Sequence, residues 1–167
     1  MVTCASCGIG RQITLILAES QVDLVLCSRN ENKLHRLAAK LSGSHKIEVI
    51  ILAFDLSVKR QVLDLLAAKE EMDSYTLIHA VGYGALSHFT QNHIHDDVKM
   101  INLNIRSTAW LTYKFGNRFS RYRKAHIVLT SSLLTFQKLI ISPHLKVHKR
   151  FWLKSKNSSK SINIFTQ

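Results

Sequence analysis

A glycine-rich turn at the start of the chain constrains the fold more than any other feature of the sequence. It reads Thr3-Cys4-Ala5-Ser6-Cys7-Gly8-Ile9-Gly10, and a segment with helical spacing of apolar residues follows it directly. Glycines in such a turn let the backbone approach a phosphate and let the next helix pack tightly against a sheet. The first turn of that helix presents unpaired N–H groups and a positive dipole end to an anion. The turn therefore predicts a strand–loop–helix unit that holds a phosphate.

The spacing of apolar residues predicts alternating helices and strands between this turn and residue 130. We expect helices over 9–20, 31–41, 57–71 and 97–119, and strands over 22–27, 46–54, 75–81 and 125–130. Ser42-Gly43-Ser44 predicts a loop, and Ser57 is expected to cap the helix that follows it. This order favours an α/β fold, a Rossmann-like doubly wound parallel sheet with helices on both faces. Because only Met1 and Val2 precede the turn, the N-terminal strand is expected to be incomplete.

The alternating pattern fades after Gln137, which divides the chain in two. Residues 1–137 are predicted to form one nucleotide-binding domain, and residues 138–167 a basic, degenerate or disordered tail. The formal net charge of the whole chain is +12, and no Asp or Glu occurs after Asp97. The positive charge is therefore concentrated in the C-terminal part of the chain. Such asymmetry is typical of some nucleic-acid-associated proteins, but no nucleic-acid-binding motif accompanies it here. A basic nucleic-acid-associated protein is therefore the less favoured alternative.

Arg29 follows the second predicted strand and lies about 20 positions beyond Gly10. Dinucleotide-binding folds place the residue that contacts the adenosine ribose at this distance. An acidic residue there favours NAD(H), whereas a basic residue favours the 2′-phosphate of NADP(H). A lone arginine after a strand is also a common solvated surface residue. In combination with the glycine turn, Arg29 predicts NADP(H) rather than NAD(H) as the cofactor.

Further motifs follow the glycine turn in the sequence: Leu26-Cys27-Ser28-Arg29-Asn30, Asp55-Leu56, the segment 77–82, Asn104 and Thr130-Ser131-Ser132. In this order, the six motifs together resemble the short-chain dehydrogenase/reductase family over about residues 1–137. Residues 3–10 resemble that family's Thr-Gly-x-x-x-Gly-x-Gly loop, with Cys4 in place of the first glycine. The segment 26–30 is similar to NADP-preferring members, and Asp55-Leu56 to the acidic dipeptide that faces the adenine. The segment 77–82 replaces the Asn-Asn-Ala-Gly motif and keeps only its glycine.

The resemblance implies the site residues and the reaction, which is the NADP(H)-dependent reduction of a small carbonyl or oxidation of an alcohol. Asn104 falls on the helix asparagine that helps to hold a proton-relay water, and Ser132 on the catalytic serine. The implied cofactor-binding residues are Thr3, Ser6, Gly8, Ile9, Gly10, Arg29, Asn30, Asp55, Leu56, Ala80 and Gly82.

The sequence departs from the family where the proton is transferred. The family uses a tyrosine and, four residues later, a lysine, but no tyrosine follows Ser132 in this chain. His148 stands at the tyrosine position and Trp152 at the lysine position, and histidine can act as a general acid near neutral pH. The resemblance also leads us to expect that the C-terminal region that forms the substrate site in the family is missing. We therefore expect weak or no activity, and a non-catalytic nucleotide-binding pseudoenzyme or a truncated or frame-shifted gene product stays open as an alternative.

The remaining motifs point away from other classes of site. Cys4-Ala5-Ser6-Cys7 spells Cys-x-x-Cys at a helix start, which is either a redox motif or a variant of the cofactor loop. His93 to Asp97 more simply caps the next helix, and no metal site is predicted. The helix 97–119 is a candidate homodimer face. The odd count of three cysteines and the lack of a long apolar run favour a cytoplasmic protein without a membrane span.

Overall fold

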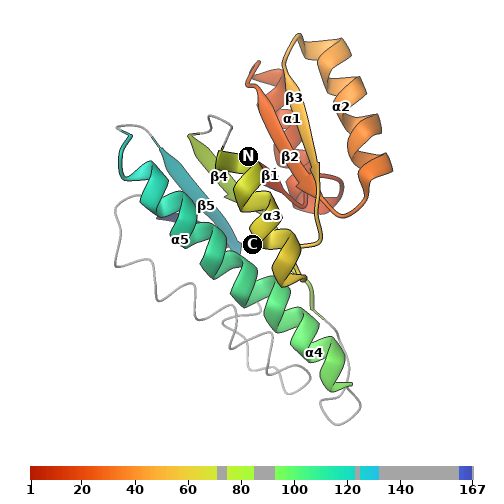
Figure 1. Cartoon of the computed structure of the whole chain (residues 1–167). Helices are drawn as coiled ribbons and strands as arrows, with labels where there is room; N and C mark the ends of the chain where they lie inside the picture. Colours follow the sequence, from red (N-terminus) through yellow and green to blue (C-terminus); the bar gives the residue numbers. More distant parts are fainter. Residues whose placement is uncertain (71–74, 85–92, 123–124, 132–161, 167) are drawn as a thin grey trace.

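The computed structural model describes residues 1–70, 75–84, 93–122, 125–131 and 162–166. Strands and helices alternate along these residues, as the sequence predicts (Figure 1). In chain order the elements are β1 (Val2–Thr3), α1 (Gly8–Glu19), β2 (Leu24–Ser28), α2 (Glu31–His45), β3 (Val49–Ala53), α3 (Lys59–Glu70), β4 (Thr76–His79), α4 (Ile94–Ile101), the π-helical segment η2 (Asn102–Ser107), α5 (Thr108–Phe119), β5 (His126–Ser131) and β6 (Ile162–Thr166). Within the described part of the chain, no helix is both long enough and apolar enough to cross a bilayer.

The strands form one sheet of order β3-β2-β1-β4-β5-β6, and every neighbouring pair is parallel. The predicted Rossmann-like α/β architecture is thus confirmed. Strand β1 is only two residues long but occupies the centre, where Val2 lies beside both Leu26 and Ile78. The backbone extends this pairing, because the N–H of Ile78 donates to the carbonyl of Met1 at 2.8 Å and the N–H of Ala5 to that of Cys27 at 3.2 Å. The short N-terminal strand therefore still joins its two neighbours.

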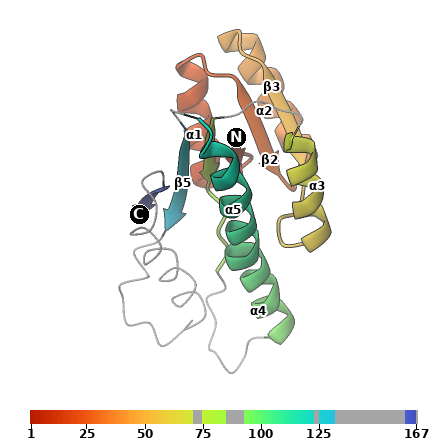
Figure 2. The same cartoon turned by 60° about the vertical axis from the view of Figure 1, so that its left-hand side comes forward.

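Helices cover both faces of the sheet, and strand β2 is buried on two sides. In β2, Leu24 and Leu26 face the core under α1 and α2, whereas Val25 and Cys27 face the core under α3 and α5. This alternation with a period of two is expected for a strand with both faces buried. Helices α3 and α5 pack side by side on one face, while α4 projects beyond the sheet (Figure 2).

Two helix predictions differ from the structure. Helix α2 continues through Ser42-Gly43-Ser44 to His45 and ends at Lys46, which adopts a left-handed φ of 52°. Burial of Leu34, Leu37 and Leu41 along one side of α2 outweighs the weak helix propensity of the Ser-Gly-Ser segment. The predicted single helix 97–119 instead begins at Ile94, with His93 as its N-cap, and contains the π-helical turn η2.

Two further predictions concern the start of α3 and the end of the chain. Helix α3 begins at Lys59, two residues later than predicted, so Ser57 lies in the turn before the helix. In that turn the side chain of Asp55 accepts the N–H of Ser57 at 2.8 Å. Strand β6 pairs in parallel with β5, although residues 162–166 lie within the predicted disordered tail. The prediction for 138–167 was a basic, degenerate or disordered tail, and apart from these five residues that segment lies outside the described residues.

Candidate functional site

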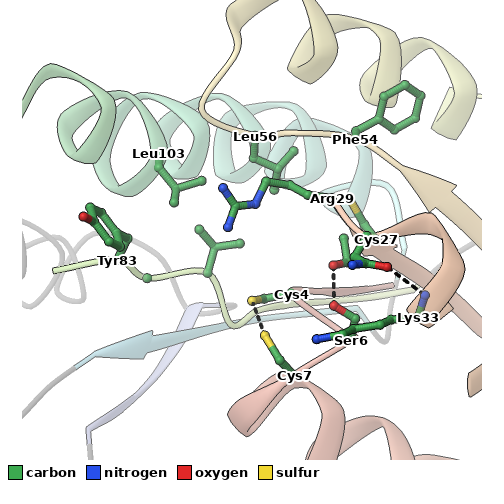
Figure 3. A pocket seen from close by; sticks show the side chains of 14 residues that line it. Cys4, Ser6, Cys7, Cys27, Arg29, Lys33, Phe54, Leu56, Tyr83 and Leu103 are labelled. Carbon is green, nitrogen blue, oxygen red and sulfur yellow. Dashed lines mark hydrogen bonds between the residues drawn. The ribbon is translucent and has the colours of Figure 1, made fainter. Parts of the chain in front are cut away.

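A cavity of about 330 Å³ opens at the carboxyl ends of the central strands (Figure 3). Its walls come from the β1–α1 turn, the end of β2 with the start of α2, the segments after β3 and β4, and η2. They comprise Cys4, Ser6, Cys7, Cys27, Ser28, Arg29, Asn30, Lys33, Phe54, Leu56, Val81, Gly82, Tyr83 and Leu103. The strand order reverses at β1, and ligands of open α/β sheets bind in the crevice at such a point. The cavity therefore has the position expected for a nucleotide site.

The glycine turn has a geometry that other residues could not easily adopt. A Cβ on Gly10 would lie 2.5 Å from the carbonyl oxygen of Cys4 and 2.8 Å from that of Thr3, so the start of α1 packs directly against the turn. Gly8 has a φ of 50°, in the left-handed region that favours glycine. Cys4 has a φ of 55°, which is the same region without glycine's freedom. Thus Cys4 adopts a glycine-like conformation, with a conformational cost.

Cations and hydroxyl groups surround the end of β2. Arg29 is 72% exposed, and its Nη1 lies 4.0 Å from Oδ2 of Asp55, which is 28% exposed. Lys33, one turn into α2, lines the same wall, and its N–H donates to the side chain of Asn30 at 2.9 Å. Nearby, the hydroxyl groups of Ser6 and Ser28 are 2.5 Å apart. This corner of the cavity offers positive charge and hydrogen-bond donors to an anionic ligand.

The opposite wall is apolar and rests on a tight turn after β3. Phe54, Leu56 and Leu103 line it, and Leu56 is buried. Asp55 has its backbone N–H bound to the side-chain oxygen of Gln61 at 2.5 Å. Because its carboxylate also accepts the N–H of Ser57, Asp55 fixes the turn that presents Leu56 to the cavity.

A chain of buried hydrogen bonds lies behind the cavity. The hydroxyl of Thr108 donates to the carbonyl of Asn104 at 2.7 Å, so it accepts from Nε2 of His79 at 2.9 Å. The Nδ1 of His79 is hydrogen-bonded to the hydroxyl of Thr3 at 3.0 Å, and this hydroxyl accepts the N–H of Ala80 at 3.1 Å. In a neutral ring, this pattern of bonds would place the proton on Nε2. They tie β1 to β4 and to α5.

Asn104 fixes the loop after β4. Its side-chain N–H donates to the carbonyl of Tyr83 at 2.6 Å, and its Oδ1 accepts the N–H of Tyr83 at 3.0 Å. Asn104 lies within the π-helical turn η2 and is 1% exposed. Single π-helical turns inside α-helices occur often at functional sites. Gly82 and Tyr83 are thereby held at the edge of the cavity.

Burial raises the pKa of two of the thiol groups in the cavity wall. Burial, followed by the neighbouring Cys7, raises the pKa of Cys4 to about 11. Burial raises the pKa of Cys27 to about 12. Both therefore carry no charge near neutral pH and do not offset the positive charge of Arg29 and Lys33, which line the same cavity. The described residues contain no group of three or more metal-ligating side chains.

The structure places the predicted site residues in three groups. Ser6, Arg29, Asn30, Leu56 and Gly82 line the cavity. A second group supports it from behind or from its turn, and contains Thr3, Gly8, Gly10, Asp55, Ala80 and Asn104. Ile9 is exposed on the first turn of α1 and lines a separate groove instead. The candidate catalytic residues Ser132 and His148 lie outside the described residues.

Several residues near the cavity are absent from the sequence-based set. Lys33, Phe54, Tyr83 and Leu103 line the cavity, and His79 organises the hydrogen bonds behind it. Two of these residues do have a signal in the sequence. His79 is a polar residue at the end of a buried strand, and Lys33 lies one helical turn after Arg29, where a second cation would face the same ligand. The other three carry no local signal, because only the sheet topology brings them together.

Comparisons with known proteins agree on a family. The family model described as "short chain dehydrogenase" matches residues 1–144. Human "Inactive hydroxysteroid dehydrogenase-like protein 1" is 30% identical over 135 residues, which are 79% of this chain and 41% of that protein. "Very-long-chain 3-oxoacyl-CoA reductase" of Lodderomyces elongisporus is 38% identical over 84 residues, 49% of this chain and 24% of the reductase. The chain thus spans about two fifths or less of the length of these relatives.

Solved structures share the fold. A short-chain dehydrogenase from Sphingobium yanoikuyae, in complex with NADPH, matches with a TM-score of 0.90 at 24% identity, over 99% of this chain and 67% of that one. A bulky-bulky ketone specific alcohol dehydrogenase from Comamonas testosteroni matches with a TM-score of 0.89 at 22% identity, over 99% and 69% of the two chains.

Proposed function

The chain belongs to the short-chain dehydrogenase family, and we propose that it binds NADP(H) in the cavity beside β1 with little or no hydride transfer. The observation that carries this proposal is the pair of cations, Arg29 and Lys33, at the end of β2 next to the glycine turn. The resident cofactor of such a protein supplies the hydride chemistry. The residues of this chain supply binding and orientation.

The residues present fit a dinucleotide phosphate at both of its anionic groups. Arg29 is exposed, and an exposed ion pair such as that with Asp55 contributes only about 0–1 kcal/mol. A 2′-phosphate can therefore replace Asp55 as the partner of Arg29 at little cost, with Lys33 as a second cation. The start of α1 and the close approach at Gly10 leave backbone donors for the pyrophosphate.

The adenine ring would lie against the apolar wall. Phe54 and Leu56 follow β3 there, and Leu103 faces them from η2. The Tyr83–Asn104 contact holds Gly82 at the opposite edge, where the nicotinamide ribose would pass. The cavity thus offers distinct polar and apolar ends to one extended ligand.

Weak chemistry is proposed from the sequence between Ser132 and Gln167. This segment has no tyrosine, and it has His148 and Trp152 where the family uses its tyrosine and lysine. A histidine without the neighbouring lysine does not reproduce the proton donor that the reduction of a carbonyl needs. The word "inactive" in the name of the human relative, which describes that protein, is consistent with this proposal.

Calorimetry with the full-length chain tests cofactor binding. We expect saturable binding of NADPH, weaker binding of NADH, and a loss of about tenfold for NADPH in Arg29→Ala, since a charge-assisted contact is worth about 1.5–3 kcal/mol. Arg36→Ala is the matched control, because Arg36 is an exposed arginine of α2 that does not line the cavity. Equal affinity for NADH and NADPH, or no effect of Arg29→Ala, would contradict the proposed selectivity.

Turnover is measured separately with a panel of ketones and aldehydes. Oxidation of NADPH at ordinary dehydrogenase rates, roughly 1–1,000 per second, would refute the proposed lack of chemistry but not the binding. No binding of either nucleotide would refute the proposed function as a whole.

A further inference from the structure

Two cysteines meet at the mouth of the cavity. The Sγ atoms of Cys4 and Cys7 are 3.6 Å apart, and both side chains line the cavity wall (Figure 3). The N–H of Cys7 points to the carbonyl of Cys4 at 3.5 Å, so residues 4–7 form a tight turn. The side chains are therefore already directed at one another across a turn that the backbone has closed.

The two thiols differ in access. Cys7 is exposed and is the N-cap residue of α1, a helix of 12 residues. Cys4 is only partly exposed and lies beside it. The third cysteine of the chain, Cys27, is buried in the core. This arrangement provides an accessible attacking thiol and an adjacent resolving thiol.

We propose that Cys4 and Cys7 are a redox-active pair that closes to an intramolecular disulfide at the mouth of the nucleotide cavity. The thiolate of Cys7 attacks a low-molecular-weight disulfide, RSSR, forms a Cys7–S–S–R bond and releases RS⁻. The sulfur of Cys4 then loses its proton to solvent, attacks the sulfur of Cys7 and displaces a second RS⁻. The two thiols together lose two electrons and two protons, and RSSR becomes two RSH.

The local geometry favours the second step over a stable mixed disulfide. The two sulfur atoms must approach from 3.6 Å to about 2 Å, which side-chain rotation within the turn can supply. The thiol of Cys4 already lies next to Cys7, so a mixed disulfide at Cys7 forms within reach of an attacking sulfur.

Trypsin separates the three cysteines in a way that makes the test direct. Cleavage after Arg11 and Arg29 leaves Cys4 and Cys7 together in peptide 1–11 and Cys27 alone in peptide 12–29. The folded, full-length chain is incubated with oxidised glutathione, denatured with a thiol-alkylating reagent, digested and analysed by mass spectrometry. We expect peptide 1–11 to be lighter than the reduced peptide by two hydrogen atoms and to carry no alkyl group, while peptide 12–29 is alkylated.

Two variants keep this experiment decisive. Cys4→Gly suits the left-handed φ at this position, and Cys7→Ser supplies a preferred N-cap residue, so both are expected to fold. Cys4→Gly should stop at the Cys7–glutathione adduct. Cys7→Ser should react at least about tenfold more slowly, because the remaining thiol is protonated and partly covered. A wild-type peptide 1–11 that is alkylated twice or carries stable glutathione would overturn the proposal.

The link to the cavity rests on the proposed function and has its own measurement. A bound dinucleotide would cover the turn, so only protein without NADPH could form the disulfide. Adding NADPH should therefore lower the rate of closure in proportion to the fraction of protein left unbound, and saturating NADPH should nearly stop it. NADPH binding is measured in the same samples by calorimetry. Unchanged closure in a chain that demonstrably binds NADPH would overturn this link, whereas a chain that does not bind NADPH contradicts the proposed function and leaves the result for peptide 1–11 decisive for the cysteine pair.

Discussion

Asn104 binds both backbone polar groups of Tyr83, so that one buried amide replaces the partners that a strand would give to this loop residue. We expect Asn104→Ala to destabilise the chain by about 2 kcal/mol, because it removes two hydrogen bonds and leaves the polar groups of Tyr83 without them. The free energy of unfolding in urea measures this loss. Asn117→Ala, an exposed asparagine of α5, is the matched control and should change it by less than about 0.5 kcal/mol.

The two glycines Gly10 and Gly43 should respond to alanine with opposite signs. In Gly10→Ala the added Cβ meets backbone oxygens that cannot move away, so we expect a loss of at least about 2 kcal/mol and a disturbed turn. In Gly43→Ala the Cβ meets no atom within 4 Å in the last turn of α2, and the better helix propensity should stabilise the chain by up to about 1 kcal/mol. Thermal unfolding of both variants distinguishes them, and equal shifts would contradict the packing at Gly10.

Cys4→Gly should raise stability. A left-handed conformation costs an ordinary residue about 1–2 kcal/mol, while glycine costs about 0.5–1 kcal/mol in the unfolded state, so a net gain of about 0.5–1 kcal/mol is expected. Lys46→Gly is the control, since Lys46 has a similar φ far from the cavity and should respond with the same sign. Measurements are made under reducing conditions, and a loss of stability in Cys4→Gly alone would mean that the sulfur contact outweighs the backbone strain.

Cys27 predicts a decrease of stability at alkaline pH. Burial raises its pKa from the unfolded value of 9.0 to about 12. Between these values the unfolded thiol loses its proton while the folded thiol keeps it, so the stability that is present below pH 9 falls as the pH rises. We therefore expect the urea midpoint to decrease from pH 8 to pH 10 more steeply in the wild-type chain than in Cys27→Ala. Parallel slopes would place the alkaline effect in other groups.

A homodimer through the helix 97–119 stays a prediction, and the exposed apolar residues of α4 favour it. Ile94, Val98 and Ile101 lie on one stripe of this helix and are exposed. We expect the chain to sediment as a dimer and Val98→Lys to shift it toward the monomer. Ile16→Lys introduces the same charge at an exposed position of α1 and should leave the dimer intact. A monomeric wild-type chain would refute this interface.

The sequence was sufficient to predict the order of strands and helices, because short strands with two buried faces and helices with one apolar stripe leave different patterns. Ser6 and Arg29, which the motifs mark as cofactor-binding residues, line the cavity, and their role in binding stays a prediction. The π-helical turn η2 could not be predicted, since helical periodicity around Asn104 does not reveal a change of hydrogen-bond spacing. The course of α2 beyond Leu41 was missed because packing decided against local propensity.

The role of Asn30 shows a similar limit. Its position in the motif marks it as a cofactor residue, and the structure shows its side chain accepting the N–H of Lys33 at the start of α2. His79 likewise acts through its hydrogen bonds to Thr3 and Thr108, which are distant from it in the sequence. Residues that act through such long-range contacts have no signature in the sequence around them.

The short strand β1 divides the sheet into two mechanical parts. Strands β2 and β3 on one side and β4, β5 and β6 on the other are joined in the sheet through Val2 and Thr3. The nucleotide cavity straddles this seam, since its cationic corner belongs to β2 and its Gly82–Tyr83 edge to β4. A ligand that contacts both parts would therefore stabilise the pairing between them. We expect slower amide hydrogen exchange at Val2 and Thr3 when the ligand is bound.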